Sequence, residues 1–467
     1  AIELMLEHAS DTLNQTYLHK MVSGEWATTM NLTEPQAGSD LSLLRTKAER
    51  EGDHYRITGQ KVFITGGDHD LSDNIVHLVL ARLPDAPPGN RGISLFLVPK
   101  FLVKEDGTLG DRNDLRPVGL EEKLGIHGSA TCVMSYGDDG GAVGYLIGEE
   151  NQGLAGMFTM MNLTRLLVGL QGVAITERAY QQALAYAKER KQGSRKNGGD
   201  APETVSIIQH PDVKRMLLDM KSIAEAGRCL TLYAAYCIDV MKREVDLETR
   251  QSHADRLALL TPIVKAWVTD RAIECASTGI QVHGGLGYIE ETGAAQHLRD
   301  ARIMAIYEGT NGIQANDLVG RKVIREQGVS LTGLCADMRS DISGVRSDAP
   351  SALLPILLAT EKSVDELESA TDWLLENALD NPDSVAAGAT AFLKISGNAV
   401  CGWLMAKCAL EAHKLLDQGD TRTEFLNGRI LTARHFADTY LAQSEGSLSA
   451  LQSGQSAVQE MSESMFG

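Results

Sequence analysis

The sequence predicts an α+β protein in which helical segments flank a central antiparallel β-barrel or sandwich domain. Three observations predict this class. Residues 25–150 contain short runs rich in Val, Ile, Leu and Thr, with no ten-residue helical pattern between them. Residues 151–326 instead place apolar residues at helical spacing. Residues 327–467 continue this spacing in a helical extension, and residues 1–24 also look helical.

The β region follows directly from the N-terminal helical segment. The chain starts with Ala1 rather than Met, inside an expected helix, so we expect the natural N-terminus to lie upstream. The predicted strands are "HYRITGQKVFITGG", "NIVHLVLARL", "GISLFLVPK" and "ATCVMSYG", separated by Gly, Asp and Pro clusters. Because no helix interrupts them, we expect antiparallel pairing rather than a doubly wound sheet.

Three long helices are expected in residues 151–326, the second beginning at Pro211 because proline suits the first helical turn. Residues 193–204, "GSRKNGGDAPET", predict a loop. In the extension, residues 351–379, 384–417 and 421–443 predict three amphipathic helices.

Composition narrows the possible partners. Lys and Arg total 44 against 62 Asp and Glu, a net charge of −18, so we expect no nucleic-acid partner. No run of eighteen uncharged apolar residues occurs, and we expect no membrane partner. Seven cysteines without a C-x-x-C pair favour reduced, mostly buried thiols and a cytoplasmic protein.

The motif "MNLTEPQAGSD" (30–40) has the composition of a ligand-binding turn. A turn at residues 38–40 exposes backbone N–H groups and the hydroxyls of Thr33 and Ser39, which suits carbonyl or phosphate oxygens. Taken alone, a hairpin turn with an Asx cap explains it better.

Two further motifs have both a functional and a structural explanation. In "KVFITGG" (61–67), Phe63 and Thr65 share one face of a strand and either cover a planar ring or pack within the sheet. In "ERKQGSR" (189–195), Arg190 lies at a helix C-terminus, where the helix dipole favours a cation in any case.

The segment "QVHGGLGYIEE" (281–291) places three glycines in four positions between helices, which permits close approach of a ligand to the backbone. His283 more commonly has a structural, hydrogen-bonded role than a ligand-binding one. No histidine or carboxylate spacing predicts a metal site. The sequence also lacks a nucleophile elbow, a P-loop and a dinucleotide-binding fingerprint.

In "IMAIYEGTNGIQ" (303–314), Glu308 stands between a tyrosine and a glycine, ahead of Thr310 and Asn311. Such a glutamate is either a solvated helix end or a general base.

Taken together and in order, six motifs resemble the acyl-CoA dehydrogenase family of flavoproteins: "LTEPQAGSD", "ITGG", "LGIHGSAT", "ERKQ", "QVHGGLGY" and "RDARIMAIYEGTNGIQ". The resemblance runs from Glu25 to Arg325. It implies N-terminal helices that are largely absent here, a central β domain and a C-terminal helical bundle, with FAD between the last two. The expected division is 1–24, 25–150, 151–326 and, for the extension, 327–467.

The resemblance also implies residue roles, with Glu308 as the catalytic base. The implied contacts to the bound FAD are Leu32, Thr33, Phe63, Ile64, Thr65, Thr310 and Asn311. The implied contacts to the FAD of the neighbouring subunit are Arg190, Gln281, Gly284 and Gly285. The implied contacts to the substrate are Ser39, Asn162, Arg165 and Gly309.

In the implied reaction, the α-proton of an acyl-CoA thioester goes to Glu308 and the β-hydride to flavin N5. The backbone N–H of Glu308 and a ribityl hydroxyl would polarise the thioester carbonyl. Some members of the family have the base beside the position of Arg165, but here that residue is Thr164, which cannot serve. A nitroalkane-oxidising relative would have Asp at position 308.

Residues 30–49 and the acidic extension resemble a bacterial subgroup of longer dehydrogenases. This subgroup includes enzymes for 3-methylmercaptopropionyl-CoA, from dimethylsulfoniopropionate breakdown. Straight short- or medium-chain acyl-CoA is the alternative substrate, and an acyl-CoA oxidase or a non-catalytic relative is the alternative class. The resemblance also implies a homo-oligomer, dimer or tetramer, and an acceptor of the electron-transfer flavoprotein type.

Overall fold

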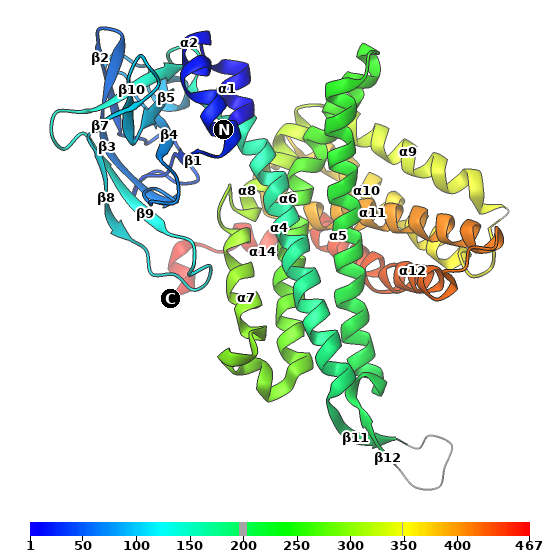
Figure 1. The fold of residues 1–467 in the computed structure, drawn as a ribbon. Helices are drawn as coiled ribbons and strands as arrows, with labels where there is room; N and C mark the ends of the chain where they lie inside the picture. Colours follow the sequence, from blue (N-terminus) through cyan, green and yellow to red (C-terminus); the bar gives the residue numbers. More distant parts are fainter. Residues whose placement is uncertain (196–202, 348) are drawn as a thin grey trace. The chain divides into compact units, whose positions relative to one another are not determined.

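The computed structural model describes residues 1–195, 203–347 and 349–467. The chain forms two compact units, Ala1–Thr164 and Arg165–Gly467 (Figure 1). The four-part division expected from the sequence stays a prediction.

The first unit begins with the expected helices. They are α1 (Ile2–His8), α2 (Asp11–Leu13), a π-helical turn at Asn14–Leu18 and α3 (His19–Ser23). Ser10 caps α2 by accepting a hydrogen bond from the Leu13 N–H, and Gly24 ends α3 at a φ of 81°.

The central domain is a curled eight-stranded sheet (Figure 1). Its order is β1-β4-β5-β10-β3-β9-β8, with β2 paired to β3. The strands of this sheet are β1 (Trp26–Asn31), β2 (Lys47–Glu51), β3 (His54–Thr65), β4 (Asn74–Ala81), β5 (Ser94–Pro99), β8 (Leu115–Leu120), β9 (Thr131–Tyr136) and β10 (Ala142–Ile147). Strands β6 (Phe101–Val103) and β7 (Leu109–Arg112) form a separate hairpin.

The antiparallel prediction holds for every pair in this sheet except β1 with β4, which is parallel. Two strands, β2 and β3, intervene between them in the chain, so β4 returns in the same direction as β1. Every residue of β4 and β5 is buried, which explains why their sequences are apolar almost throughout rather than alternating.

The second unit contains most of the three long predicted helices. They are α4 (Gly153–Glu189), whose first turns belong to the first unit, α5 (Pro211–Arg243) and α6 (Leu247–His283). Helix α5 begins at Pro211, as predicted. The shorter α7 (Ala294–Arg302) and α8 (Asn311–Asn316) follow.

By length and composition alone, α4 is apolar enough to cross a membrane. In the structure it packs closely on α6. A Cβ on Gly169 would lie 2.5 Å from Val264 Cγ1, and one on Gly172 would lie 3.0 Å from Val268 Cγ1. One face of α4 is therefore packed within the bundle.

The loop predicted at 193–204 is wrong at its ends. Residues Lys191–Arg195 form β11 and pair with β12 (Glu203–Ser206). Because its composition is polar and rich in glycine, this exposed ribbon was not predicted as strands. Residues 196–202 lie outside the described part of the chain.

The extension contains the three predicted helices as α10 (Leu354–Asn377), α11 (Pro382–Asp417) and α12 (Thr423–Phe436), the last continuing through a π-helical turn to α13 (Ala442–Gln452). Helix α9 (Val329–Arg346) was not predicted. The chain ends in α14 (Ser456–Glu460) and a single turn at Glu463–Phe466. One continuous apolar core includes α5, α6 and the extension.

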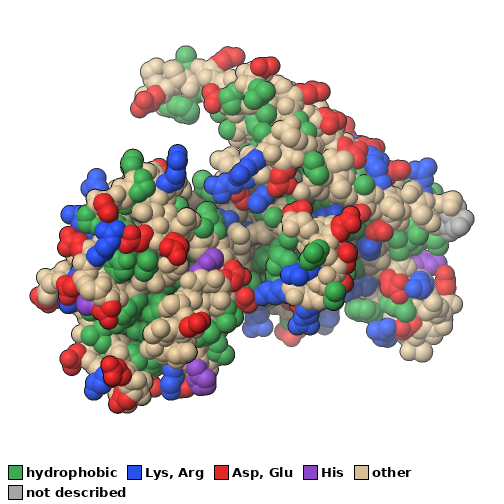
Figure 2. Space-filling model, turned by 90° about the horizontal axis from the view of Figure 1, so that it is seen from above, with side chains coloured by type: hydrophobic (Ala, Val, Ile, Leu, Met, Phe, Trp, Pro, Cys, Tyr) green, Lys and Arg blue, Asp and Glu red, His purple; other side chains and the backbone are tan. Residues whose placement is uncertain are grey.

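Acidic side chains are scattered over the face shown in Figure 2, interspersed with Lys and Arg. This distribution agrees with the negative net charge of the sequence.

Candidate active site

Glu308 lies on the short connection between a turn at Ile303–Ala305 and α8. Both Glu308 and Gly309 have left-handed backbones, with φ of 58° and 82°. This conformation is costly for a glutamate. The buried Gln314 side chain holds it by donating to the carbonyls of Glu308 and Gly309, each at 3.4 Å. A Cβ at position 309 would lie 2.7 Å from Gln314 Nε2, so glycine is required there.

Asn311 fixes the other end of this connection to α6. Its Nδ2 donates to Asp270 Oδ1 at 2.7 Å and to Thr269 Oγ1 at 3.0 Å. Its Oδ1 accepts from Lys265 Nζ at 2.7 Å. The Thr310 hydroxyl caps α8 by accepting from the Ile313 N–H at 3.2 Å. The side chain of Asn311 therefore points into α6, and only its backbone remains for a cofactor.

The electrostatics around Glu308 favour a basic carboxylate. Burial raises its pKa to about 6, against the opposing effect of the cations Arg165 and Lys265. Burial lowers the pKa of Lys265 to about 8, while Asp270 and Glu308 act in the opposite direction. Arg165 is buried on α4, and burial lowers its pKa while Asp317 and Glu308 favour its charge. A carboxylate of this kind can accept a weakly acidic proton near neutral pH.

Asn162 is exposed and lies three residues before Arg165 on α4. Residues at this spacing share a helix face.

In the first unit, the structure joins two of the motifs found in the sequence. Val62 N–H donates to Thr33 O at 2.9 Å, and Lys61 Nζ donates to Leu32 O at 3.0 Å. Lys61 also forms a buried ion pair with Glu34, with Nζ and Oε1 2.8 Å apart. The segments at 32–34 and 61–65 are therefore held together by two hydrogen bonds and a buried ion pair.

Glu34 organises the loop that follows it. Its carboxylate accepts from the N–H groups of Arg45 and Thr46, at 2.7 and 3.0 Å, and from the Thr46 hydroxyl at 2.6 Å. Burial opposes its charge, but Lys61 and these hydrogen bonds lower its pKa to about 2. The Asx turn considered for this loop is present, because Asp40 Oδ1 accepts from the Ser42 N–H at 2.9 Å. Ser39 is exposed.

Phe63 is displayed by a bulge in β3. The β3–β9 register shifts between Lys61 and Ile64, and Phe63 has a φ of 61° with 63% of its surface exposed. Thr65 is exposed on the same face, as expected. The side chains of Ile64 and Leu32 are buried in the core, so neither presents its side chain to a cofactor.

The remaining predicted residues lie at the ends of α4 and α6. Arg190 is exposed and follows α4 directly. Gln281 is exposed in the last turn of α6, and Gly284 ends this helix with a φ of 62° and ψ of −140° that only glycine adopts readily. A Cβ on Gly284 or Gly285 would meet nothing within 4 Å.

His283 has a structural role in the chain. It is buried, lies 2.7 Å from Gly279 O through Nδ1, and stacks on Tyr186 with ring centroids 4.6 Å apart. Among the described residues, no group of three or more His, Cys, Asp or Glu is placed to hold a metal ion.

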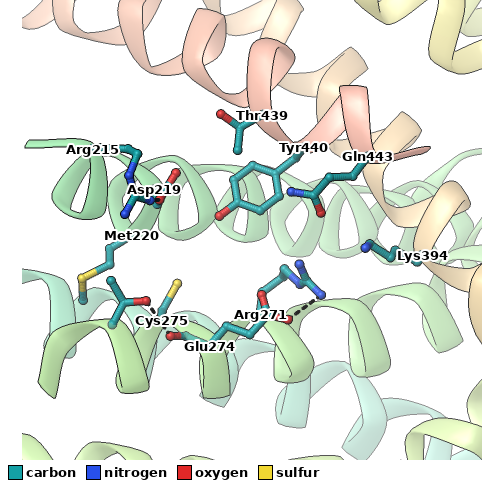
Figure 3. Close-up of a pocket in the computed structure, with 11 residues that line it drawn as sticks. Arg215, Asp219, Met220, Arg271, Glu274, Cys275, Lys394, Thr439, Tyr440 and Gln443 are labelled. Carbon is teal, nitrogen blue, oxygen red and sulfur yellow. Dashed lines mark hydrogen bonds and ion pairs between the residues drawn. The ribbon is translucent and has the colours of Figure 1, made fainter. Parts of the chain in front are cut away.

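A cavity of about 370 Å³ lies elsewhere, between α5, α6, α11 and residues 439–443 (Figure 3). None of the site residues predicted from the sequence lines it. Its charged side chains largely pair with each other: Arg215 donates to Asp219 at 2.7 Å, and Arg271 lies 2.7 Å from Glu274. We interpret it as a polar interface between the bundle and the extension.

Comparisons with known proteins identify the family. Residues 29–138 match the model "Acyl-CoA dehydrogenase, middle domain", and residues 151–323 match "Acyl-CoA dehydrogenase, C-terminal domain". Residues 334–462 match "Acetyl-CoA dehydrogenase C-terminal like". The chain is 48% identical to 3-methylmercaptopropionyl-CoA dehydrogenase of Ruegeria pomeroyi, over 95% of this chain and 74% of that protein. The chain belongs to the acyl-CoA dehydrogenase family.

A further sequence similarity supports this assignment, and a solved structure supports the fold. The acyl-CoA dehydrogenase is 38% identical to a butyryl-CoA dehydrogenase of Syntrophomonas wolfei, over all of this chain and 77% of the relative. An acyl-CoA dehydrogenase of Bacillus anthracis complexed with FAD has the same fold, with a TM-score of 0.75 at 20% identity, covering 99% of this chain and 74% of that one.

Acyl-CoA dehydrogenases use FAD, and residues of this chain fit that cofactor. Phe63 presents an exposed aromatic face on a strained, solvent-facing bulge. The space that a side chain would occupy at Gly284 or Gly285 is open, which permits close approach of a cofactor to the backbone.

Four structurally important residues were missed by the sequence analysis: Glu34, Lys61, Lys265 and Asp270. Glu34 lies within a quoted motif, so its burial next to a proline was the available signal. Lys61 also begins a quoted motif, but the pattern of its strand gave no indication of buried charge, and neither did that of α6, which contains Lys265 and Asp270.

Proposed function

We propose that this acyl-CoA dehydrogenase oxidises 3-methylmercaptopropionyl-CoA to methylthioacryloyl-CoA, with Glu308 as the catalytic base. The observation that supports this substrate is the 48% identity to the Ruegeria pomeroyi dehydrogenase, against 38% and 37% for two butyryl-CoA dehydrogenases. In this proposal the chain acts in the degradation of dimethylsulfoniopropionate and is cytoplasmic.

The chemistry of this chain's own residues begins at Glu308. Its carboxylate takes the α-proton, and its raised pKa makes it a better base than an exposed glutamate. Its backbone N–H polarises the thioester carbonyl, which stabilises the charge that develops there. Bound FAD supplies the acceptor for the hydride equivalent from the β-carbon.

Other residues bind and orient. We assign substrate contacts to Ser39, Asn162, Arg165 and the backbone of Gly309. We assign contacts to the bound FAD to the segments at 32–33, 63–65 and 310–311. We assign contacts to the FAD of a neighbouring subunit to Arg190, Gln281, Gly284 and Gly285. The proposal therefore includes a homo-oligomer and an electron-transfer flavoprotein as acceptor.

The test is anaerobic reduction of the purified yellow holoenzyme. Addition of 3-methylmercaptopropionyl-CoA should bleach the flavin absorbance rapidly, and reoxidation in air should be slow. Bleaching by butyryl-CoA alone would refute the proposed substrate, and rapid reoxidation in air would place the enzyme among the oxidases.

The base is tested separately with Glu308→Gln. This variant should retain its flavin and bind acyl-CoA, yet bleach about 10²–10⁴ times more slowly. Bleaching at the wild-type rate would refute the role of Glu308. As a second candidate, straight short-chain acyl-CoA is supported by the butyryl-CoA dehydrogenases, and the same bleaching series measures it directly.

A further inference from the structure

Two cysteines that are far apart in the sequence meet between the bundle and the extension. Cys229 of α5 and Cys408 of α11 have their Sγ atoms 3.6 Å apart. They are also the two half-buried cysteines, whereas the other five are buried. The pair is therefore both close and more accessible than any other thiol of the chain.

A cation lies close to this pair. Arg429 of α12 forms an ion pair with Glu225 at 2.7 Å, and its charge also acts on both thiols. The hydrogen bond with Cys229 lowers the pKa of Cys408, Arg429 lowers it further, and burial and Glu225 oppose this change. The same hydrogen bond, together with burial, raises the pKa of Cys229. Of the two thiols, Cys408 is therefore the more readily ionised, and either sulfur can donate the hydrogen bond that links them.

We propose that Cys229 and Cys408 form a redox modification site that hydroperoxides convert to a reversible disulfide between α5 and α11. The Cys408 thiolate attacks one peroxide oxygen, the O–O bond breaks, and Cys408 becomes a sulfenic acid as hydroxide leaves and takes up a proton. The Cys229 sulfur then attacks the Cys408 sulfur, the S–O bond breaks, and water leaves. The two sulfurs lose two electrons, and hydrogen peroxide is reduced to two molecules of water.

The geometry requires little movement. The two sulfurs must approach by about 1.5 Å to reach a bond length of about 2.05 Å. Helices α5 and α11 already pack together near the pair, where Cys401, two turns before Cys408, lies with its sulfur 3.9 Å from Ala226 O. Cys401 and Cys237 are buried and form no sulfur–sulfur hydrogen bond among the described residues, so we expect them to stay reduced.

The experiment treats the reduced holoenzyme with a small excess of hydrogen peroxide. Thiol titration after denaturation should then show the loss of two of the seven thiols. Tryptic digestion without reductant should yield peptide 229–242 joined to peptide 408–414, two hydrogens lighter than the sum of the two peptides. Because Cys237 lies within the first peptide, the mapping is repeated in Cys237→Ala, which should give the same cross-link.

Cys229→Ser and Cys408→Ser should each abolish the cross-link. Oxidised wild type should unfold at a higher denaturant concentration than reduced wild type, and dithiothreitol should reverse this shift. Retention of all seven thiols in wild type, or a cross-link that joins two chains, would refute the proposal. This result does not depend on whether the serine variants fold, because it is measured in the wild-type protein.

Discussion

Burial makes the Glu308 carboxylate more basic than an ordinary glutamate, although two cations oppose the effect. Arg165 and Lys265 both lower the pKa of Glu308, and burial raises it by more than they lower it. The value of about 6 is therefore the result of competing effects, and removing either cation should shift it upward.

The pH dependence of kcat/KM should report this balance. Glu308 must be ionised to accept a proton, so kcat/KM should rise as pH increases through about 6 and level off above it. Lys265 is cationic in this range because its own pKa is about 8. Lys265→Met should thus move the midpoint to higher pH, by up to about one unit. As a control, Lys394→Met removes a lysine of α11 and should leave the midpoint unchanged. An unshifted midpoint in Lys265→Met would contradict the proposed effect of Lys265 on the pKa of Glu308.

At the residue scale, the role proposed for Glu308 could be predicted from the sequence, but its environment could not. The motif around it was recognisable, and the left-handed backbone at Gly309 agrees with an obligatory glycine. Lys265 and Asp270 lie in α6, more than thirty residues earlier in the chain, and only folding brings them to Asn311. A contact of this kind is not encoded in any local pattern.

Among the structural elements, the loop after β1 depends on one buried ion pair. Lys61 is fully buried and Glu34 nearly so, and each charge is stabilised mainly by the other. Removing one partner leaves an uncompensated buried charge.

Lys61→Met should therefore destabilise the protein by about 3–5 kcal/mol, measured by chemical denaturation. The double variant Glu34→Gln/Lys61→Met should recover part of this loss, because it leaves no lone charge but sets an amide NH2 group against N–H donors of the loop. Lys47→Met on exposed β2 is the matched surface control and should have little effect. If Lys47→Met lowered the free energy of unfolding as much as Lys61→Met, the buried ion pair would not explain the effect.

The contact between α6 and α11 is unusually close. A Cβ on Gly397 would lie 2.2 Å from Trp267 Cδ1, and Trp267 Nε1 donates to Asn398 Oδ1 at 2.9 Å. The bundle and the extension are thus interlocked through a glycine and a buried tryptophan.

Gly397→Ala should overpack this contact and cost about 1–3 kcal/mol of stability. Gly333→Ala is the control, because Gly333 lies in α9 with open space around it, and it should be neutral or stabilising by up to about 1 kcal/mol. Equal denaturation midpoints for the two variants would show that Trp267 can move to accommodate the methyl group without loss of stability.

For the whole molecule, the proposed sharing of FAD between subunits predicts complementation. Glu308→Gln lacks the proposed base, and Gly285→Val fills the open space proposed for a neighbour's cofactor without a left-handed backbone at the changed residue. Refolding the two together should give mixed oligomers in which one site has both an intact base and an intact neighbour. In a statistical mixture of dimers, about a quarter of all sites should be active. If the refolded mixture were no more active than the separate variants, the proposed sharing of FAD between subunits would be refuted.

The order of helical and β regions was predictable because hydrophobic periodicity changes near residue 151. The parallel β1–β4 pair was not, because pairing depends on how β2 and β3 are placed in space. The ribbon of β11 and β12 was missed for a related reason: its strand residues are mostly exposed, so no alternation of apolar residues marks it.

The interlock between Trp267 and Gly397 has a consequence for how such a chain can be divided. A protein cut after residue 326 would expose Trp267, which is 2% exposed here, together with the apolar face of α6 that α11 covers. The extension is therefore not a removable module. A related protein without the extension would need polar residues on this face of α6, or another subunit that covers the face.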